Sequence, residues 1–306
     1  MVSNKACFAC TIACGRVSQI SEEGQGRYNL HTSPRNWKES TEGPEYENAW
    51  SLGADCGIDD LDAILKSNTM CNDLGMDPIS LGATLAAAME LYEDGIVTDA
   101  MAGMPLPFGS AEALIAMTEK TAYRDGFGDE LAEGSKRMGE KLGRPDVFMG
   151  VKGQEFPAYD PRAIQGMGLG YATSNRGACH LRAYTISSEM LGVGDAEGPE
   201  SPVGKGELAK AFQDISTAVD ATGLCLFLTF GVGLDEIAPI MAAATGHPYT
   251  PGELERAGER IWNLERVWNM RAGITAADDT LPKRMLEQPI PAGPTKARTS
   301  RLSEMM

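Results

Sequence analysis

Three cysteines near the start of the chain have the spacing of a metal-binding loop. Cys7, Cys10 and Cys14 form a C-x2-C-x3-C run, which places three thiolates on one tight loop. A soft metal centre with tetrahedral coordination needs a fourth thiolate ligand from elsewhere in the chain. Cys225, at the end of the segment that begins at Asp220, is the best candidate. The four cysteines therefore predict a metal centre, either iron–sulfur or structural zinc.

Two segments share a pattern that could bind a ligand. Asn72-Asp-Leu-Gly-Met-Asp77 and Asp220-Ala-Thr-Gly-Leu-Cys225 each begin with a carboxylate or an amide, followed three and four positions later by glycine and a long apolar residue. Both lie at the predicted C-terminal end of a helix, where glycine lets the chain turn and present oxygen acceptors. Two such ends facing each other would hold a ligand with paired donors. The alternative is that both are ordinary glycine caps.

The overall composition and charge limit which partners and which cellular compartment we expect for this protein. The 306 residues include 43 acidic and 27 basic side chains, a formal net charge of −16, which disfavours nucleic acid or an anionic membrane surface as a partner. Seven cysteines is an odd number and no secretory signal precedes the first, so we expect the cytoplasm and no disulfide framework. The longest apolar run, residues 223–234, is shorter than the about 20 residues of a membrane span.

The segments that must position these residues show mainly the apolar periodicity of helices. Asp59 or Asp60 precedes a helix that ends at Gly75, and Asp77-Pro78 begins a second helix that ends at Gly95, so we expect an αα-hairpin. Further helices are expected over residues 110–124, 129–142, 207–220 and 235–245. No convincing alternating strand series is found. The predicted fold class is therefore mainly α.

The last predicted helix begins at a capping box. Thr250 and Glu253 flank a proline at the first helical position, and the helix is expected to run through Trp268. The residues expected to face the core in the first and last helices are Leu61, Ile64, Leu65 and Leu74, and Leu254, Ala257, Ile261, Leu264 and Trp268.

Three stretches lack this periodicity. Residues 18–44 are polar, and we expect a surface loop there. Residues 151–183 form a long connection rich in glycine, which is unusual in a compact domain unless it is functional. We therefore place a domain boundary near residue 150, between domains 1–149 and 150–306. The Pro-rich tail after Gly273 is expected to be extended.

Several motifs follow one another in a specific order. They are CFACTIACGRV, EGPEYE, the two helix-end segments, VKGQEFPAYDPR, NRGACHLRA and DDTLPKR. In this order they resemble the aldehyde ferredoxin oxidoreductase family, and the resemblance corresponds to its second and third domains. It implies two helical domains related by a pseudo-repeat, with the cofactor site between them. The implied cofactors are a tungsten or molybdenum bis-pterin and a 4Fe-4S cluster.

The resemblance also implies roles for individual residues. The cluster would be ligated by Cys7, Cys10, Cys14 and Cys225, and the pterins would be contacted by Asn72, Met76, Asp77, Arg182, Asp220 and Leu224. In aldehyde oxidation, Glu47 would take a proton from water and His180 would donate to the carbonyl oxygen. Glu45 is the alternative to Glu47. No role is assigned to His31 or His247, and buried thiols are expected at Cys56, Cys71 and Cys179.

The sequence departs from the family pattern in three places. Asn72 replaces the usual acid and Met76 replaces leucine, so one pterin amine would receive a neutral rather than a charge-assisted hydrogen bond. Residues 66–69, KSNT, stand where some members carry an E-x-x-H pair, so a homodimer would form without that interface metal. The family's β-rich N-terminal domain is absent, and we expect it upstream in the same polypeptide or in a separate subunit.

The predicted function is the cluster-binding and catalytic-pocket part of an aldehyde:ferredoxin oxidoreductase. Such an enzyme oxidises a small aldehyde with water to a carboxylic acid and passes electrons through the cluster to ferredoxin. One alternative is a non-catalytic 4Fe-4S electron-transfer module or split subunit, favoured by Asn72 and the absent first domain but opposed by Glu47, His180 and Asp220. The other is a relative that acts on acyl-CoA or hydroxy acids.

Overall fold

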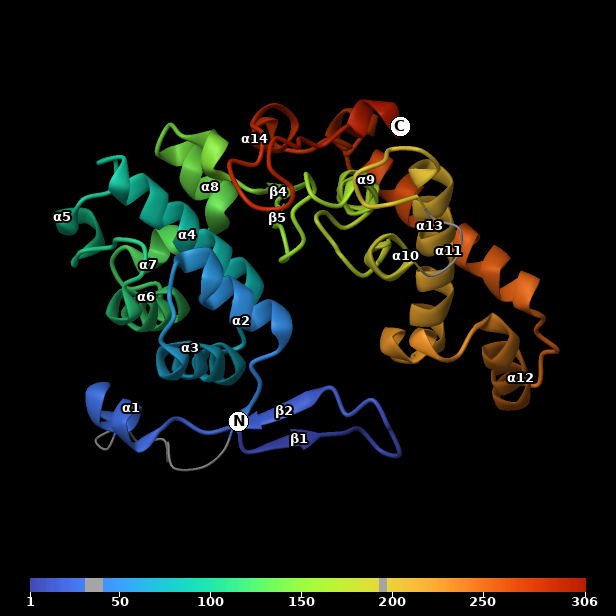
Figure 1. Cartoon of the computed structure of the whole chain (residues 1–306), viewed down its shortest axis with the longest axis horizontal. Coiled ribbons are helices and arrows are strands. Elements are labelled where there is room, and N and C mark those ends of the chain that lie inside the picture. The colour runs from blue at the N-terminus through green and yellow to red at the C-terminus, as the bar shows by residue number, and fades with distance from the viewer. Residues whose placement is uncertain (31–40, 193–196) are drawn as a thin grey trace. The chain divides into compact units, whose positions relative to one another are not determined.

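The chain is mainly helical, as predicted. In the computed structural model, residues 1–30, 41–192 and 197–306 are described, and these contain fourteen α-helices and only short strands. The chain divides into two compact units, one formed by Met1–Met149 with Glu155–Ala158 and the other by Gly150–Gln154 with Tyr159–Met306 (Figure 1). Within the described residues, every helix is too short or too polar to cross a lipid bilayer.

The first unit consists of a small sheet and a group of helices. Its strands are β1 (Ser3–Lys5), β2 (Gly15–Ser18) and β3 (Thr41–Glu42), paired antiparallel in that order. Its helices are α1 (Glu22–Arg27), α2 (Tyr46–Leu52), α3 (Leu61–Leu74), α4 (Pro78–Glu93), α5 (Asp99–Ala102), α6 (Ala111–Tyr123), α7 (Gly128–Leu131) and α8 (Gly134–Lys141), with 3-10 turns η2 (Ala54–Cys56) and η3 (Pro145–Val147).

Helix α4 is the centre of this unit. Its buried residues, from Leu81 to Leu91, lie on more than one face of the helix, and a helix that is apolar on all sides requires neighbours on all sides. Helices α2, α6, α7 and α8 supply them (Figure 1). At Gly82, an added Cβ would lie 2.5 Å from the carbonyl oxygen of Ser51 on α2, so glycine permits this close approach.

The caps of α3 and α4 are as predicted, but the αα-hairpin is wrong. Asp60 caps α3, Gly75 ends it with φ 71°, and Asp77 caps α4 with Pro78 at the first position. However, α3 packs mainly on α6, and α4 packs mainly on α2 and α8, so each helix buries its apolar residues chiefly against helices other than its neighbour in sequence. Leu61 is 55% exposed and Leu74 is 36% exposed, since the buried face of α3 passes through Ile64, Leu65, Asn68 and Cys71.

Two other predictions for this unit need correction. The helix expected over 129–142 is two helices, α7 and α8, which are separated by residues 132–133, and Gly134, the first residue of α8, adopts φ 81°. The expected surface loop over 18–44 contains α1, whose N-terminus is capped by Ser21, and β3, which pairs with β2. Residues 31–40, including His31, lie outside the described residues.

The second unit is organised around two long helices. Its elements are β4 (Gly150–Val151), β5 (Gln154–Glu155, which ends in the first unit), α9 (Gln165–Thr173), α10 (Ile186–Leu191), α11 (Lys205–Thr222), η4 (Leu226–Phe230), α12 (Leu234–Thr245), α13 (Pro251–Arg271), η5 (Ala276–Asp278), α14 (Lys283–Glu287) and η6 (Leu302–Glu304). Helix α11 lies beside α13 and also contacts α9 (Figure 1). A Cβ at Gly258 would lie 2.0 Å from the Asp214 carbonyl oxygen, so this glycine sets the spacing of α11 and α13.

The Gly-rich stretch and the C-terminal tail are more ordered than predicted. Residues 165–173 form the buried helix α9, because its glycines allow close packing: a Cβ on Gly170 would lie 2.7 Å from the Cβ of Ala183. The tail expected to be extended contains α14 and two 3-10 turns. The capping box of α13 is confirmed, but Leu264 and Trp268, expected in the core, are 70% and 73% exposed.

Candidate functional site

The first three cysteines lie on the loop between β1 and β2. Lys5 pairs with Gly15 at the base of this hairpin, and the Cys10 amide donates to the Cys7 carbonyl oxygen at 3.1 Å. Cys7 and Cys14 are exposed and Cys10 is half-buried. The residues directly before Cys10 and Cys14, Ala9 and Ala13, adopt φ 55° and 48°. Non-glycine residues in this left-handed region are uncommon and cluster at functional sites.

Exposure separates the four predicted ligands from the other cysteines. In the second unit, Cys225 is exposed at the start of η4, two residues after Gly223, which adopts φ 77°. The three cysteines without a predicted role, Cys56, Cys71 and Cys179, are buried as expected. Burial also raises the pKa of Cys71 to about 12. Accessible thiols on a turned loop are the donor set that an iron–sulfur cluster requires.

The three thiols of the first unit, Cys7, Cys10 and Cys14, do not form a ready metal site by themselves. Across residues 1–30, 41–192 and 197–306, no three His, Cys, Asp or Glu side chains lie together as a metal site. What the structure establishes for this motif is the loop, its backbone conformation and the exposure of its sulfurs.

A polar cavity in the first unit includes Asn72. It encloses about 540 Å³ and is lined by Thr41, Glu42, Gly43, Glu45, Asn48, Asn68, Thr69, Asn72 and Asp73. The Asn72 amide is 3.5 Å from the Glu42 carbonyl oxygen, at the limit of a hydrogen bond. By contrast, Asn68 is held on both sides, accepting from Asn48 at 2.8 Å and donating to Glu42 at 3.2 Å. Asn72 is therefore the weakly held amide of this cavity.

Met76 and Asp77 have roles within the first unit itself. Met76 is partly buried against the helical core. The Asp77 carboxylate accepts from the amide of Ile79 at 3.1 Å as the cap of α4. Of the three residues predicted to contact one pterin, only Asn72 lines the polar cavity.

In the second unit, the structure brings two predicted cofactor residues together. Arg182 forms an ion pair with Asp220, with Nη1 and Oδ2 at 3.0 Å, and the two side chains are 15% and 40% exposed. Arg182 Nη1 also lies 3.4 Å from the hydroxyl of Thr217, one turn earlier on α11. The third predicted residue, Leu224, packs against an apolar cluster that includes Val219 and Ile237.

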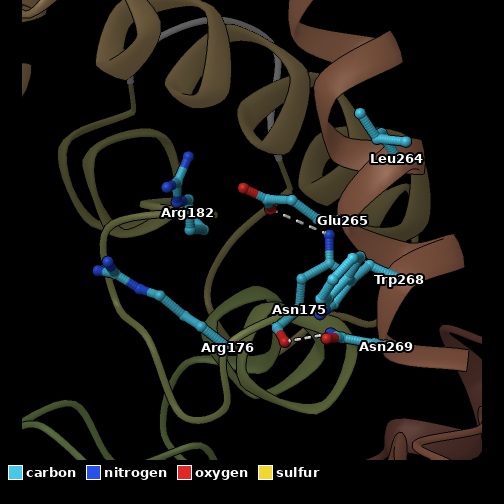
Figure 2. A pocket seen from close by; sticks show the side chains of 7 residues that line it. All are labelled: Asn175, Arg176, Arg182, Leu264, Glu265, Trp268 and Asn269. Atoms are coloured by element: carbon cyan, nitrogen blue, oxygen red, sulfur yellow. Dashed lines mark hydrogen bonds between the residues drawn. The ribbon is translucent and has the colours of Figure 1, made fainter. Parts of the chain in front are cut away.

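Arg182 and Arg176 line a cavity of about 370 Å³. Figure 2 shows that both arginines lie opposite α13, which contributes Leu264, Glu265, Trp268 and Asn269. Asn175 joins the loop to α13 by donating to the Trp262 carbonyl oxygen at 2.9 Å and by accepting from Asn269 at its own carbonyl oxygen. The two guanidinium groups give this wall of the cavity its positive charge.

His180 lies in an aromatic cluster. Its ring centroid is 5.9 Å from that of Tyr159 and 6.3 Å from that of Tyr184, and the two tyrosine hydroxyls are 3.1 Å apart. Burial, with a smaller effect of the Arg176 charge, lowers the pKa of His180 to about 4. The imidazole is therefore neutral near pH 7 and can donate a hydrogen bond without carrying charge.

Glu47 and its competitor Glu45 have different surroundings. Glu47, on α2, is half-buried, and its Oε2 accepts from the amide of Ala158 at 2.8 Å. Burial raises the pKa of Glu47, and this hydrogen bond partly offsets the rise. Glu45 is exposed and lies 3.5 Å from Arg16 in an ion pair. Of the two carboxylates, Glu47 has the environment of a proton acceptor.

Sequence reasoning missed an apolar cavity in the second unit. The cavity encloses about 320 Å³, and Tyr184, which contacts His180, is part of its wall. Most of the remaining wall comes from α11, η4 and the start of α12. The apolar run over residues 223–234 contains these η4 residues, and its aromatic content was the available signal.

Comparisons with known proteins agree on one family. A family model described as "Aldehyde ferredoxin oxidoreductase, domains 2 & 3" matches residues 1–306. A tungsten-containing aldehyde ferredoxin oxidoreductase of Pyrococcus furiosus is 48% identical over 310 residues, covering 100% of this chain and 49% of the relative. The corresponding protein of Thermococcus kodakarensis is 47% identical over 310 residues, also 100% of this chain and 49% of the relative. The chain thus spans about half the length of these curated relatives.

Two more distant similarities extend the comparison. The WOR-like subunit of an aliphatic sulfonate oxidoreductase of Pyrococcus furiosus is 26% identical over 300 residues, covering 95% of this chain and 44% of the relative. Among solved structures, the active-site complex BamBC of benzoyl coenzyme A reductase with 1,5-dienoyl-CoA superposes with a TM-score of 0.72 at 18% identity. That match covers 92% of this chain and 46% of the other, and it establishes similarity of fold alone.

Proposed function

The chain belongs to the aldehyde ferredoxin oxidoreductase family, and from this premise we propose that it is the cluster-binding and catalytic-pocket part of an aldehyde:ferredoxin oxidoreductase. The proposed reaction oxidises an aldehyde with water to a carboxylic acid and passes two electrons, one at a time, to ferredoxin. Because the chain spans about half of its relatives' length, the activity is proposed for an assembly that also contains the other half.

Two cofactors complete the proposal. Cys7, Cys10, Cys14 and Cys225 would hold a 4Fe-4S cluster, which supplies one-electron transfer. A tungsten or molybdenum bis-pterin, which supplies the two-electron oxidation, would be held by Asn72, Met76 and Asp77 and by Arg182, Asp220 and Leu224. Support in the first unit comes from Asn72, which lines a polar cavity. Support in the second unit comes from the Arg182–Asp220 pair, which offers a cation and a carboxylate acceptor side by side.

His180 is proposed to bind the carbonyl oxygen of the aldehyde. The low pKa of its half-buried imidazole keeps the ring neutral, so its N–H donates to the oxygen as negative charge develops there. The two neighbouring tyrosine rings restrict the orientation of the imidazole. This environment of His180 is the observation that carries the catalytic assignment.

Glu47 is proposed to take the proton of the attacking water. Its pKa is raised by burial, which makes the carboxylate a better base than an exposed glutamate. A positioned general base of this kind contributes roughly 100- to 10,000-fold to a rate. The amide of Ala158 fixes one carboxylate oxygen, so the proton is assigned to the other oxygen, Oε1.

The test combines cofactor content with activity. The chain is purified together with the remaining half, in the same polypeptide or as a complex with a second one, and iron, acid-labile sulfide, tungsten, molybdenum and pterin are measured. We expect about four iron atoms per chain and aldehyde-dependent reduction of a viologen dye. His180→Ala should reduce that rate roughly 100-fold or more with cofactor content unchanged, whereas His247→Ala should leave the rate unchanged. Zinc without iron would contradict the cluster, and full activity of His180→Ala would contradict the catalytic role.

A further inference from the structure

A buried lysine lies at the turn of the hairpin segment, residues 150–158, which contains β4 and β5. Lys152 and Gly153 form the two-residue turn, with φ 52° and 88°. A turn with positive φ at both central residues favours asparagine and glycine, and a lysine there is uncommon. Backbone strain of this kind clusters at functional sites. The side chain of Lys152 is nevertheless only 3% exposed, so it reaches inward from a strained turn.

The ammonium of Lys152 has three acceptors for its three hydrogens. Nζ donates to the carbonyl oxygens of Ala172 at 2.6 Å and Ser174 at 3.0 Å, and it lies 2.7 Å from Oδ1 of Asp279. Asp279 is 6% exposed and is also bound by Arg266, whose Nη1 lies 2.9 Å from the same oxygen. A charged lysine therefore satisfies two carbonyls at the C-terminal end of α9 and is itself held by a paired carboxylate.

These contacts hold the start of the loop that carries His180. Ser174 is the C-cap of α9, and the loop that begins there reaches His180 six residues later. The same hairpin contacts the loop at Gly177, where an added Cβ would lie 2.7 Å from the carbonyl oxygen of Val151 and 2.8 Å from the Cβ of Gln154. The hairpin therefore holds the loop by hydrogen bonding at Ser174 and by close packing at Gly177.

The end of the hairpin segment holds the other proposed catalytic side chain. Glu155 and Ala158 belong to the first unit. Glu155 is 5% exposed and accepts from the amide and the hydroxyl of Ser135 at 3.1 and 2.7 Å. Three residues later, the amide of Ala158 donates to Oε2 of Glu47 at 2.8 Å. The segment thus contributes its first part to the second unit and its last part to the first unit, and each part contacts one proposed catalytic region within its own unit.

From these contacts we propose that the hairpin segment sets the positions of both proposed catalytic side chains. Lys152 is the positioning residue for the loop of His180. Glu155 anchors the part of the segment that fixes Glu47. A proton acceptor or a hydrogen-bond donor acts only within a narrow range of distances, so the groups that fix its backbone affect its efficiency. The inference rests on the proposed function for the roles of His180 and Glu47, but the positions of both can be measured without turnover.

Lys205 provides a matched control for Lys152. Its side chain is 1% exposed, and its ammonium also has two carbonyl acceptors and one carboxylate partner. These acceptors are the carbonyl oxygens of Glu197 and Gly198 and the carboxylate of Glu189. Lys152→Met and Lys205→Met therefore remove the same kind of buried cation from the same unit. The acceptors of Lys152 include the start of the His180 loop, whereas those of Lys205 lie at residues 189, 197 and 198.

Two measurements on the full 306-residue chain report the position of His180. NMR titration of Lys152→Met should show the pKa of His180 rising from about 4 toward the ordinary 6.5, because a loosened loop admits water to an imidazole now buried in an aromatic cluster. Hydrogen exchange of the amides of residues 175–180, normalised to those of α11, should become roughly tenfold faster. Lys205→Met should change neither quantity.

Gly177→Ala tests the second contact without changing any charge. The added methyl group meets the carbonyl oxygen of Val151, so the loop must move away from the hairpin, and the pKa of His180 and the loop exchange should change in the same direction as in Lys152→Met. Gly204→Ala is the control, because Gly204 also has a left-handed backbone, with φ 71°, but an added Cβ there meets nothing within 4 Å. If Lys152→Met does not fold, Gly177→Ala decides the result.

Glu155→Ala tests the part of the hairpin segment that fixes Glu47. Exchange of the Ala158 amide should become roughly tenfold faster. Glu155→Gln retains an oxygen acceptor for the amide and hydroxyl of Ser135 and should restore most of the protection. Glu112→Ala, which removes an exposed glutamate of α6, should leave the Ala158 amide unchanged. In the assembly with the remaining half, Lys152→Met and Glu155→Ala should each slow aldehyde oxidation roughly tenfold or more.

The outcomes separate this inference from the proposed function. Wild-type loop exchange and an unchanged pKa of His180 in both Lys152→Met and Gly177→Ala, or equal changes in Lys205→Met, would overturn the positioning role. Unchanged exchange of the Ala158 amide in Glu155→Ala would overturn the anchor. Full aldehyde oxidation by an assembly with His180→Ala would instead contradict the catalytic assignment, and the exchange and titration results would still decide whether the hairpin segment positions the loop.

Discussion

Arg182 and Asp220 form an ion pair at 3.0 Å, although they lie 38 positions apart in the sequence. Arg182 belongs to the loop that carries His180, and Asp220 lies in the last turn of α11. The side chain of Arg182 is 15% exposed, so removing the carboxylate would leave a largely buried cation that, among the described residues, keeps a weak contact with the Thr217 hydroxyl at 3.4 Å. The pair thus joins the His180 loop to α11.

Asp220→Asn is predicted to lower the free energy of unfolding by about 1 kcal/mol, a value kept small because Asp220 is 40% exposed and water screens the pair. Urea denaturation measures the change. Glu255→Gln, on the exposed side of α13, should be neutral. A double-mutant cycle with Arg182→Met isolates the pair, and a coupling energy indistinguishable from zero would contradict it.

The stability of the chain should fall in acid because of His180. The folded-state pKa of about 4 lies below the ordinary value of 6.5, so the unfolded chain binds this proton first as the pH decreases. The free energy of unfolding should therefore decrease by roughly 3 kcal/mol between pH 6.5 and pH 4, relative to a His180→Gln variant measured in parallel. NMR titration of the imidazole protons gives the folded-state pKa directly.

The charge next to this histidine supplies the control for that titration. Arg176 lowers the pKa of His180 by repulsion of the imidazolium, while burial among Tyr159 and Tyr184 is the larger cause. Arg176→Gln should therefore raise the pKa of His180 while leaving it below the ordinary value. An unperturbed titration of His180 in the folded chain would show that the imidazole is solvated.

Thiol reactivity should divide the cysteines into two classes. In the folded chain without metal, Cys7, Cys10, Cys14 and Cys225 should react with Ellman's reagent, whereas the buried Cys56, Cys71 and Cys179 should react only after unfolding. Burial limits access of the reagent to all three thiols, and it also raises the pKa of Cys56 and Cys71, which slows these two further because the thiolate is the reactive form. Mass spectrometry of iodoacetamide adducts identifies each site, and rapid native labelling of Cys71 would be the contrary result.

Two glycines of α13 should respond in opposite directions to the same substitution. Gly258→Ala places a methyl group 2.0 Å from the Asp214 carbonyl oxygen, so α11 and α13 must separate, at a cost of about 1–3 kcal/mol in the free energy of unfolding. Gly252→Ala meets only the end of the Arg256 side chain at 3.5 Å and should stabilise the helix by about 0.5–1 kcal/mol. Thermal denaturation compares them, and equal effects would contradict the close helix contact.

Local sequence signals predicted where the longest helices begin and end. Asp60, Asp77, Ser110 and Thr250 all cap helices, because capping depends on a hydrogen bond to a backbone amide only two or three residues away. The mainly α fold class followed from the same short-range periodicity. The cysteine spacing likewise indicated one ligand loop, and the ordered motifs indicated the family.

Which helix faces become buried could not be predicted in the same way. Trp268 continues the apolar stripe of α13 but is exposed, whereas α9, despite its glycines, is buried. The predicted pairing of α3 with α4 was wrong for the same reason. Which helices pack together depends on how well their surfaces fit one another. Such matches involve residues far apart in the chain, and periodicity within one helix carries no information about them.

By itself, the sequence determined the family, the fold class, the helix caps and the residues with the chemistry to act. The tertiary structure alone decided the environments of these residues: the neutral imidazole of His180 among tyrosines, the pairing of Arg182 with Asp220, and the apolar cavity that shares Tyr184 with His180. The physical reason is that a pKa depends on desolvation and on the charges that folding brings close. A cavity likewise depends on which segments folding brings together. The residue types and their spacing determine which side chains are available to the site. The distances that folding sets between remote segments determine the pKa values and the neighbours of those side chains.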